Sequence, residues 1–368
     1  MPKGVSLNFL ESRSILSIFS SSLIAIDIGS SAIKLVELGG KLKNKIVSLG
    51  FEPLPPGAMV GGVIQEKDPI QLALKNLISR HKLRTFLRRA STSLGGNSVI
   101  LKKVNFQADE GNIDEAIYYQ AEQHLQYDMN DLYFDYAIQE SELVTTQVPV
   151  VLVGAKRETV DERLALLKSI KLKIGVVDCD VFALVNGFEH SYGSLDGVIV
   201  LADVGAASTQ VVFIGHGRYL YSREISISGE SYTKALSAEF GLSYADADKL
   251  KIDISLGKQQ QPRAQQIIKE LNQQFASDLQ AIFEIFFQSG ESLLGVNTAQ
   301  AIFLAGGAAR TWSLTDDLSL ALQVPVAVMN PFQNVTVPKN FISQSLYEQS
   351  HLFGVAHGLG LRSFVENK

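Results

Sequence analysis

The strongest constraint on the fold is a short pattern that occurs twice, about half a chain apart. Residues 26–31 read IDIGSS, and residues 202–209 read ADVGAAST. Each copy stands between runs of apolar residues, within 23–38 and 197–217, which is typical of two strands joined by a glycine turn. A pattern repeated at this spacing predicts two related α/β lobes, each with one such hairpin.

Both turns carry the residue types that a phosphate site needs. A tight glycine turn exposes consecutive backbone N–H groups to phosphate oxygens, and hydroxyl groups add further donors. Asp27 and Asp203 come at strand ends, and we expect them to face each other across one cleft and to bind Mg²⁺ through water. Lys34 would neutralise a terminal phosphate. The residues expected to contact the nucleotide from these two turns are Gly29, Ser30, Ser31, Lys34, Gly205, Ala206, Ser208 and Thr209.

A third glycine turn supports this interpretation. Residues 301–310 read AIFLAGGAAR, a buried-type strand that enters Gly306 and Gly307. Glycines there let the backbone approach an adenine ring and its ribose, so we expect contacts from both glycines, Ala308 and Arg310. One Asp-x-Gly turn alone is more simply a hairpin turn, because Asp and Gly are ordinary turn residues. The two copies and the third turn together favour a nucleotide site.

Apolar periodicity and turn residues predict the remaining elements. A continuous apolar stripe after Pro262 predicts one long helix, and Gly241 is placed to end the helix before it. The predicted helices lie at 68–90, 109–126, 157–170, 180–190, 229–241, 262–290 and 343–361. The predicted strands outside the two hairpins lie at 99–106, 148–155, 174–178 and 301–305.

Composition narrows the class of protein. The chain has 368 residues, 46% of them hydrophobic, and a net charge of −5, which fits a globular protein and does not favour nucleic acid as a partner. The single cysteine, Cys179, cannot form an internal disulfide, which fits a reducing compartment. Asp27 and Asp203 interrupt the longest apolar runs, so no transmembrane helix is expected. For residues 1–22 the sequence leaves an added strand, a weak amphipathic tether and a flexible arm open.

The order of the motifs resembles the superfamily of actin, the sugar kinases and the heat-shock chaperone ATPases. Its phosphate-1, connecting, phosphate-2 and adenosine motifs correspond to Asp27–Gly29, Asp178–Phe188, Asp203–Gly205 and Gly306–Gly307. Within this superfamily the chain is most similar to the PilM family, the actin-like proteins of type IV pilus assembly. That resemblance rests on IDIGSSAIKLVEL, EAIYYQAEQHLQYDMNDLYFDY, DVGAASTQVVFI and LAGGAAR, and it extends from Leu23 to Arg362.

The resemblance implies an α/β fold, namely an actin-like two-lobed ATPase fold with an FtsA-type inserted small domain. The implied segments are an N-terminal arm at 1–22, a first lobe from 23–98, 176–197 and 340–368, an inserted small domain at 99–175, a second lobe from 198–241 and 299–339, and a helical subdomain at 242–298.

The resemblance also implies ATP and Mg²⁺ as ligands. Gly229 stands at the start of a predicted helix, and residues 247–251 read ADKLK, similar to the family's Ala-Glu-x-Leu-Lys segment that contacts the nucleoside. Gly229, Asp248 and Lys251 are therefore added to the expected nucleotide contacts. No general base is evident in the sequence, so we expect slow ATP hydrolysis or none.

The implied function is that of a cytoplasmic ATP-binding scaffold at the inner membrane, in a type IV pilus that drives twitching motility or in a related secretion system. Its expected partner is the N-terminal cytoplasmic tail of a PilN-like membrane protein, through which it would reach the membrane only indirectly. An FtsA-like cell-division filament protein and a small-molecule kinase are alternatives. The ending Phe364–Lys368 is too short for the membrane helix of the first, and no substrate-pocket motif favours the second. Self-association is left open.

The expected partner surface is a groove beside the helix at 109–126. Ile113, Ile117 and Ala121 recur every four residues and share one face. Tyr127 and three further aromatic residues follow, and aromatic side chains can anchor an extended apolar peptide. The alternative is that these side chains fill the core of the inserted domain itself.

Overall fold

The computed structural model describes residues 23–83, 89–107, 113–139, 147–289, 296–337 and 348–363. Its chain forms two compact units. Unit 1 comprises Met1–Ala183 and Leu359–Lys368, and unit 2 comprises Leu184–Gly358. Predicted elements that reach into 84–88, 108–112, 290–295 or 338–347 extend outside the described residues there.

Unit 1 contains a five-stranded mixed sheet. Strand β1 is antiparallel to β2, which is antiparallel to β3, whereas β1, β6 and β10 run parallel to one another. The predicted hairpin at 23–38 is thus confirmed as β1 and β2. Along the sheet the strands are β10 (Lys173–Cys179), β6 (Arg89–Leu94), β1 (Ile24–Ile28), β2 (Ala32–Gly39) and β3 (Lys45–Pro53).

A second, three-stranded sheet in unit 1 carries one helix on its face. The strands are β7 (Val99–Gln107), β9 (Gln147–Lys156) and β8 (Leu132–Ile138), all antiparallel, and the helix is α2 (Ile113–Leu125). One side of α2 packs on the sheet. Together they enclose a small core formed by Phe106, Ile117, Ala121, Leu125, Leu132, Val150 and Leu152. We call this sheet with α2 the three-stranded layer.

Helices and short strands complete unit 1. They are β4 (Met59–Val60), β5 (Val63–Ile64), α1 (Lys67–Arg80) and α3 (Arg157–Ser169), with single 3-10 turns at Gly96–Ser98 and Met129–Asp131. The predicted helix at 68–90 is wrong in its last part. Helix α1 ends at Arg80, and Arg89–Leu94 is strand β6, which lies in the sheet between β1 and β10.

Unit 2 repeats the sheet plan of unit 1. Its five strands follow the order β13 (Arg218–Ile225), β12 (Thr209–Gly215), β11 (Val198–Val204), β14 (Ala299–Ala305) and β15 (Val326–Val328). Here too an antiparallel hairpin is paired in parallel with a later strand, β11 with β14. The sequence repeat therefore corresponds to two sheets of like topology, with β11 and β12 in the place of β1 and β2.

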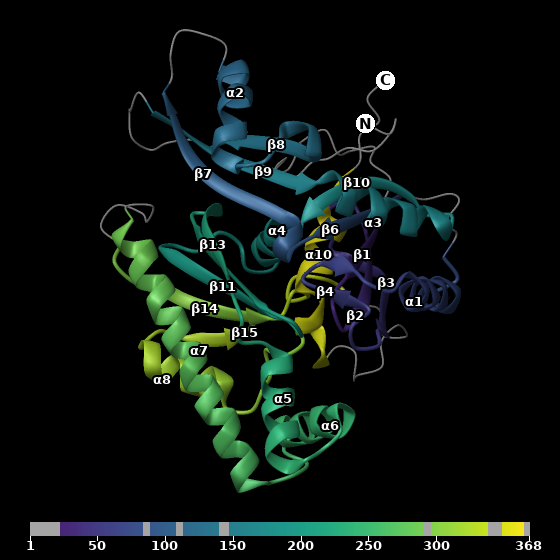
Figure 1. Ribbon diagram of the computed structural model, residues 1–368, viewed down its shortest axis with the longest axis vertical. Helices are drawn as coiled ribbons and strands as arrows, with labels where there is room; N and C mark the ends of the chain where they lie inside the picture. The colour runs from purple at the N-terminus through teal and green to yellow at the C-terminus, as the bar shows by residue number, and fades with distance from the viewer. Residues whose placement is uncertain are drawn as a thin grey trace. The chain divides into compact units, whose positions relative to one another are not determined.

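The helices of unit 2 pack on this sheet and on one another. They include α5 (Gly229–Phe240), α6 (Tyr244–Ser255), α7 (Pro262–Gln288) and α8 (Leu314–Leu322). The apolar stripe of α7, the long green helix in Figure 1, buries Phe275, Leu279 and Phe286 in the core of the unit. Gly241 ends α5 in the left-handed conformation, with a φ of 62°, as its position predicted.

The chain passes through two further helices, α4 (Asp180–Tyr192) and α10 (Gly354–Leu361), the second preceded by a 3-10 turn at Ser350–Phe353. In unit 1 the segment after α10 is held by charged side chains. Arg362 donates from Nε and Nη2 to the two carboxylate oxygens of Asp178, at 2.6 and 2.8 Å, and both side chains are buried. Lys43 donates to the carbonyl oxygens of Gly360, Leu361 and Arg362. Burial and the nearby Arg362 charge lower the pKa of Lys43 to about 8.

Candidate nucleotide site

In unit 1 the first glycine turn carries a lysine directly above it. The Gly29 N–H donates to the Ala32 carbonyl at 3.1 Å, which closes the turn. Lys34 is the cross-strand neighbour of Asp27, and its Nζ lies 3.1 Å from Asp27 Oδ2. The same Nζ lies 2.8 Å from the position a Cβ would take on Gly29. Ser30 is half-buried and Ser31 exposed, so the turn, its hydroxyls and the ammonium form one small polar surface.

In unit 2 the second glycine turn is fastened to the start of α5. The Gly205 N–H donates to the carbonyl oxygens of Asp203 and Ser208, both at 3.0 Å. The carbonyls of Gly205 and Ala206 in turn accept from the N–H groups of Gly229 and Glu230, at 2.9 and 2.8 Å. Predicted contacts Gly205 and Gly229 are thus neighbours, and Ala206 and Ser208 lie half-buried on the same turn.

The third glycine turn lies beside the second. Gly306 follows β14 with a φ of +87°, a conformation that favours glycine. A Cβ there would collide with Asp203 Oδ1 and with the Val204 carbonyl. The Ala308 N–H donates to that carbonyl at 2.9 Å. Asp203 therefore lies against the Gly306 backbone, as expected if these motifs serve one ligand, while Gly307 and Arg310 are exposed.

A polar cluster joins α5 to α6 next to these turns. Lys251 Nζ lies 2.6 Å from Asp248 Oδ1 and donates to Thr233 Oγ1 at 2.8 Å and to the Gly229 carbonyl at 3.1 Å. Thr233 Oγ1 also donates to Asp248 at 3.1 Å. The structure thus brings predicted residues Gly229, Asp248 and Lys251 together. Thr233 was not among the predicted residues, although its position one helical turn after Gly229 was a usable signal.

Tyr244, at the start of α6, is a second residue that sequence analysis missed. Its side chain is partly exposed, and its pKa is raised by burial and by the carboxylates of Glu230 and Asp248. Aromatic rings with one exposed face are suited to stacking on a planar ligand. The ring adds an apolar element to the rim of a surface that is otherwise polar.

Thr209 lies in this region but has a different role from the one predicted. It is completely buried, and its hydroxyl donates to the Ile227 carbonyl at 2.6 Å. Because this hydroxyl holds β12 to the segment before α5, it stabilises the turn and is not presented to a phosphate.

The predicted metal ligands belong to different units, and their expected opposition stays a prediction. Asp27 lies in unit 1 and Asp203 in unit 2. In the described part of the chain, no three His, Cys, Asp or Glu side chains are grouped as a metal site.

The predicted partner residues separate into core and surface. Ile117 and Ala121 are completely buried in the core of the three-stranded layer, which favours the alternative that they hold the layer together. Tyr127 is 42% exposed, with Lys156 Nζ 5.4 Å from its ring centre. For Ile113 the structure gives only its place as the first residue of α2. On the outer side of α2, Tyr118 and Tyr119 are 57% and 78% exposed.

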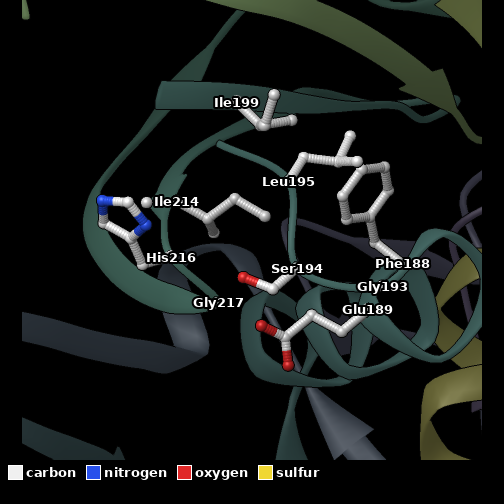
Figure 2. Close-up of a pocket in the computed structure, with 10 residues that line it drawn as sticks. Phe188, Glu189, Gly193, Ser194, Leu195, Ile199, Ile214, His216 and Gly217 are labelled. Carbon is white, nitrogen blue, oxygen red and sulfur yellow. The ribbon is translucent and has the colours of Figure 1, made fainter. Parts of the chain in front are cut away.

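Unit 2 also contains a shallow recess that the sequence did not predict. Figure 2 shows apolar side chains, among them Phe188, Leu195 and Ile214, lining it, with Ser194 and Glu189 beside them. The recess lies at the Val198 end of β11, whereas Asp203 and Gly205 lie at the other end. It is therefore separate from the glycine turns.

Comparison with known proteins identifies the family. Residues 25–364 match the family model described as "Type IV pilus assembly protein PilM". This chain belongs to the PilM family. A solved structure of a PilM–PilN type IV pilus biogenesis complex contains a chain that is 27% identical, with a TM-score of 0.78 over 93% of this chain and 98% of that one. The predicted PilM resemblance is confirmed.

More distant structures confirm the actin-like ATPase fold. The ethanolamine utilization protein EutJ from Carboxydothermus hydrogenoformans is 12% identical, with a TM-score of 0.55 over 94% of this chain and 91% of that chain. MreB 5 of Spiroplasma citri, solved bound to AMPPNP, is 13% identical, with a TM-score of 0.51 over 91% and 94%. Among the described residues of this PilM family member, no helix has both the length and the apolar character needed to span a bilayer.

Proposed function

We propose that this PilM family member is an ATP-binding scaffold of type IV pilus assembly that captures the cytoplasmic tail of a PilN-like membrane protein. The observation that carries the ATP assignment is the continuous surface in unit 2. There the Gly205 turn, the Gly306 turn and the start of α5 contact one another, beside the Thr233, Asp248 and Lys251 cluster.

This surface offers a separate element to each part of ATP. The glycine turns bring backbone close to a ligand without side-chain obstruction, as phosphates and an adenine ring require. Asp248 supplies a carboxylate acceptor suited to ribose hydroxyls, and Lys251, whose three N–H donors bond Gly229, Thr233 and Asp248, holds that carboxylate in place. Asp203 beside Gly306 would orient water around Mg²⁺. In unit 1, Lys34 supplies a positive charge above a second glycine turn.

The proposal assigns ATP a structural role, with turnover slow or absent. A nucleotide that binds the folded state stabilises it by mass action and can favour one conformation over another. For this role, ATP needs only to bind one conformation of the protein more tightly than another. Phosphate transfer to a small molecule would favour the kinase alternative, to which the family match gives no support.

Calorimetric titration of Mg·ATP tests the nucleotide assignment. Lys251→Met removes the ammonium that bonds Asp248 and Thr233, and we expect ATP affinity to fall about tenfold. Lys234→Met is the matched control, because Lys234 lies on α5 in an exposed pair with Glu230 at 2.7 Å. Equal affinity in both variants would remove the cluster from the ATP site.

The partner assignment follows from the family and from the three-stranded layer. The related structure is of a PilM–PilN complex, and we propose a PilN-like tail as the partner here. Tyr118 and Tyr119 present rings to solvent on α2, and Tyr118 packs edge-on against Phe134 of β8 at 6.3 Å between ring centres. Exposed aromatic rings that pack against a partly buried ring are suited to bind an apolar peptide. Capture of this tail would hold the protein at the cytoplasmic face of the inner membrane.

Fluorescence anisotropy with a labelled peptide copying that tail tests the surface. Tyr119→Arg keeps the core of the layer and should weaken peptide binding at least about tenfold. Leu72→Arg is the control, because Leu72 is a similarly exposed apolar residue on α1 of the same unit. Ala121→Arg should instead disrupt the layer, since Ala121 is fully buried. Unchanged peptide affinity in folded Tyr119→Arg would rule out this face of α2.

A further inference from the structure

Arg163 is a buried cation close to the turn that carries Asp27 and Gly29. It lies on the inner face of α3 with Val160 and Leu167 and is only 3% exposed. Its Nη1 donates a long hydrogen bond, 3.5 Å, to the carbonyl of Ile28, the last residue of β1. Its Nη2 donates to the Gly62 carbonyl at 3.4 Å. One guanidinium thus connects three separate segments of unit 1.

The charge of Arg163 is only partly compensated by these contacts. Burial lowers the pKa of its guanidinium, and the carboxylates of Asp180, Asp27 and Glu162 act in the opposite direction. Within the described residues its Nε has no hydrogen-bond partner. Burying a guanidinium with only weak contacts lowers the stability of the folded state, and such groups are found where the charge is needed at a functional site. One of these carboxylates, Asp27, lies one residue before the Ile28 carbonyl that Arg163 contacts.

Asp27 already has one counter-charge, the ammonium of Lys34 at 3.1 Å. In the proposed function Lys34 also binds a phosphate, which would draw it from the carboxylate. Arg163 then supplies a second positive charge that acts on Asp27 from a buried position on α3. The Ile28 carbonyl, one residue after Asp27, is the atom through which the guanidinium holds the strand end.

We propose that Arg163 is a positioning residue of the nucleotide site, which holds the Ile28 end of β1 and links occupation of the adjacent turn to α3 and the three-stranded layer. The link is short, because α3 begins at Arg157 directly after β9, the central strand of that layer. This inference rests on the proposed function, in which the Gly29 turn of unit 1 contributes to ATP binding. Coupling between two sites is reciprocal. If ATP binding stabilises α3, then stabilising α3 or the three-stranded layer increases ATP affinity by the same free energy.

Three variants distinguish the effect of the Arg163 charge, the effect of its two carbonyl contacts and a general effect of substitution on α3. Arg163→Met removes the charge and both carbonyl contacts, and Mg·ATP affinity should fall about tenfold by calorimetry. Arg163→Lys keeps the charge but cannot reach the Ile28 and Gly62 carbonyls together, so it should restore part of the affinity. Lys168→Met is the control on the same helix, because it removes an exposed cation from the last turn of α3. It should leave ATP affinity unchanged.

Hydrogen exchange on the wild-type protein tests the link even if Arg163→Met does not fold. Mg·ATP should slow amide exchange in α3 as well as in α5, and in Arg163→Lys the slowing should persist in α5 but be lost in α3. Wild-type affinity and wild-type slowing of α3 in Arg163→Lys would overturn the inference while leaving the ATP site standing. Absence of Mg·ATP binding to the wild-type protein would overturn the proposed function and this inference with it.

Discussion

Lys34 Nζ lies 3.1 Å from Asp27 Oδ2 and 2.8 Å from the position that a Cβ would take on Gly29. One ammonium therefore pairs with a carboxylate and also lies over a glycine turn. Both side chains are largely buried, at 16% and 10% exposure, which strengthens their attraction relative to a surface pair. An incoming phosphate would therefore meet an ammonium that is already held in place.

The first prediction concerns this ammonium. Lys34→Met removes it and leaves Asp27 without its cross-strand partner, so Mg·ATP affinity should fall about tenfold in a calorimetric titration. Lys41→Met, at an exposed position following the same hairpin, should leave ATP affinity unchanged. If Lys34→Met bound Mg·ATP like the wild-type protein, the unit 1 turn would have no part in the site.

The second prediction concerns Gly306. Gly306→Ala adds a Cβ that collides with Asp203 Oδ1 and the Val204 carbonyl at a φ of +87°. Gly57→Ala is the matched control, since Gly57 has a φ of +85° with nothing within 4 Å of its Cβ position. We expect Gly57→Ala to cost about 1 kcal/mol in the free energy of unfolding, and Gly306→Ala to cost about 2 kcal/mol more because of the collision. Equal losses in urea unfolding would show that the collision is relieved.

The third prediction concerns the buried pair of Asp178 and Arg362. Arg362→Met leaves the Asp178 carboxylate buried without its partner, at a cost of about 3–5 kcal/mol in unfolding free energy. Glu239→Gln breaks the exposed, two-pronged pair of Arg263 with Glu239 and should change stability little. Similar small losses in chemical unfolding of the two variants would mean that Asp178 finds another partner or takes up a proton.

The fourth prediction concerns pH. Burial, with the nearby Arg310 charge, lowers the pKa of His351 to about 4, and burial, with His190, lowers that of His357 to about 3. Unfolded histidines titrate near 6.5, so the unfolded chain binds more protons below that pH. Stability is thus fully present above pH 6.5 and falls as the pH drops towards 4, by about 3 kcal/mol for His351 alone.

Urea unfolding at pH 7.5, 6 and 5 measures this loss. His351→Gln should remove the His351 part of the pH dependence and leave the His357 part, whereas His216→Gln, which replaces an exposed histidine, should preserve both. A wild-type stability that stays constant from pH 7.5 to 5 would contradict the assignment of neutral buried histidines.

The sequence predicted both hairpins because Asp-x-Gly turns between apolar runs leave few alternatives, and their repetition predicted the two matching sheets. It did not predict β6, since a helical pattern before it extends into Arg89 and its buried Ser91, Thr92 and Ser93 carry no apolar signal. Those small polar residues are explained by packing: Ser91 donates to the Leu359 carbonyl at 2.9 Å, a contact 268 residues away in sequence.

At the candidate site, the sequence predicted the glycine turns but not which residues of the protein contact them. The turns at Gly205 and Gly306 follow from local sequence, but the contact of Gly306 with Asp203 depends on the parallel pairing of β11 with β14. On α2, periodicity predicted the shared face of Ile117 and Ala121, but periodicity alone does not say whether such a face meets a core or a partner. Arg163 carried no local signal, because its role comes from segments more than 100 residues away.

One measurement tests the central claim most directly, which is that ATP binds with Mg²⁺ at the glycine turns that carry Asp27 and Asp203. Calorimetric titration of the wild-type protein should give saturable binding of one ATP per chain, tighter with Mg²⁺ than in EDTA. With Mg²⁺ present, Asp27→Asn and Asp203→Asn should each bind ATP more weakly than the wild-type protein, since an amide is a poorer partner for hydrated Mg²⁺ than a carboxylate. In EDTA both variants should bind ATP as tightly as the wild-type protein does in EDTA. Absence of saturable ATP binding, or unchanged Mg·ATP affinity in both variants, would contradict the account.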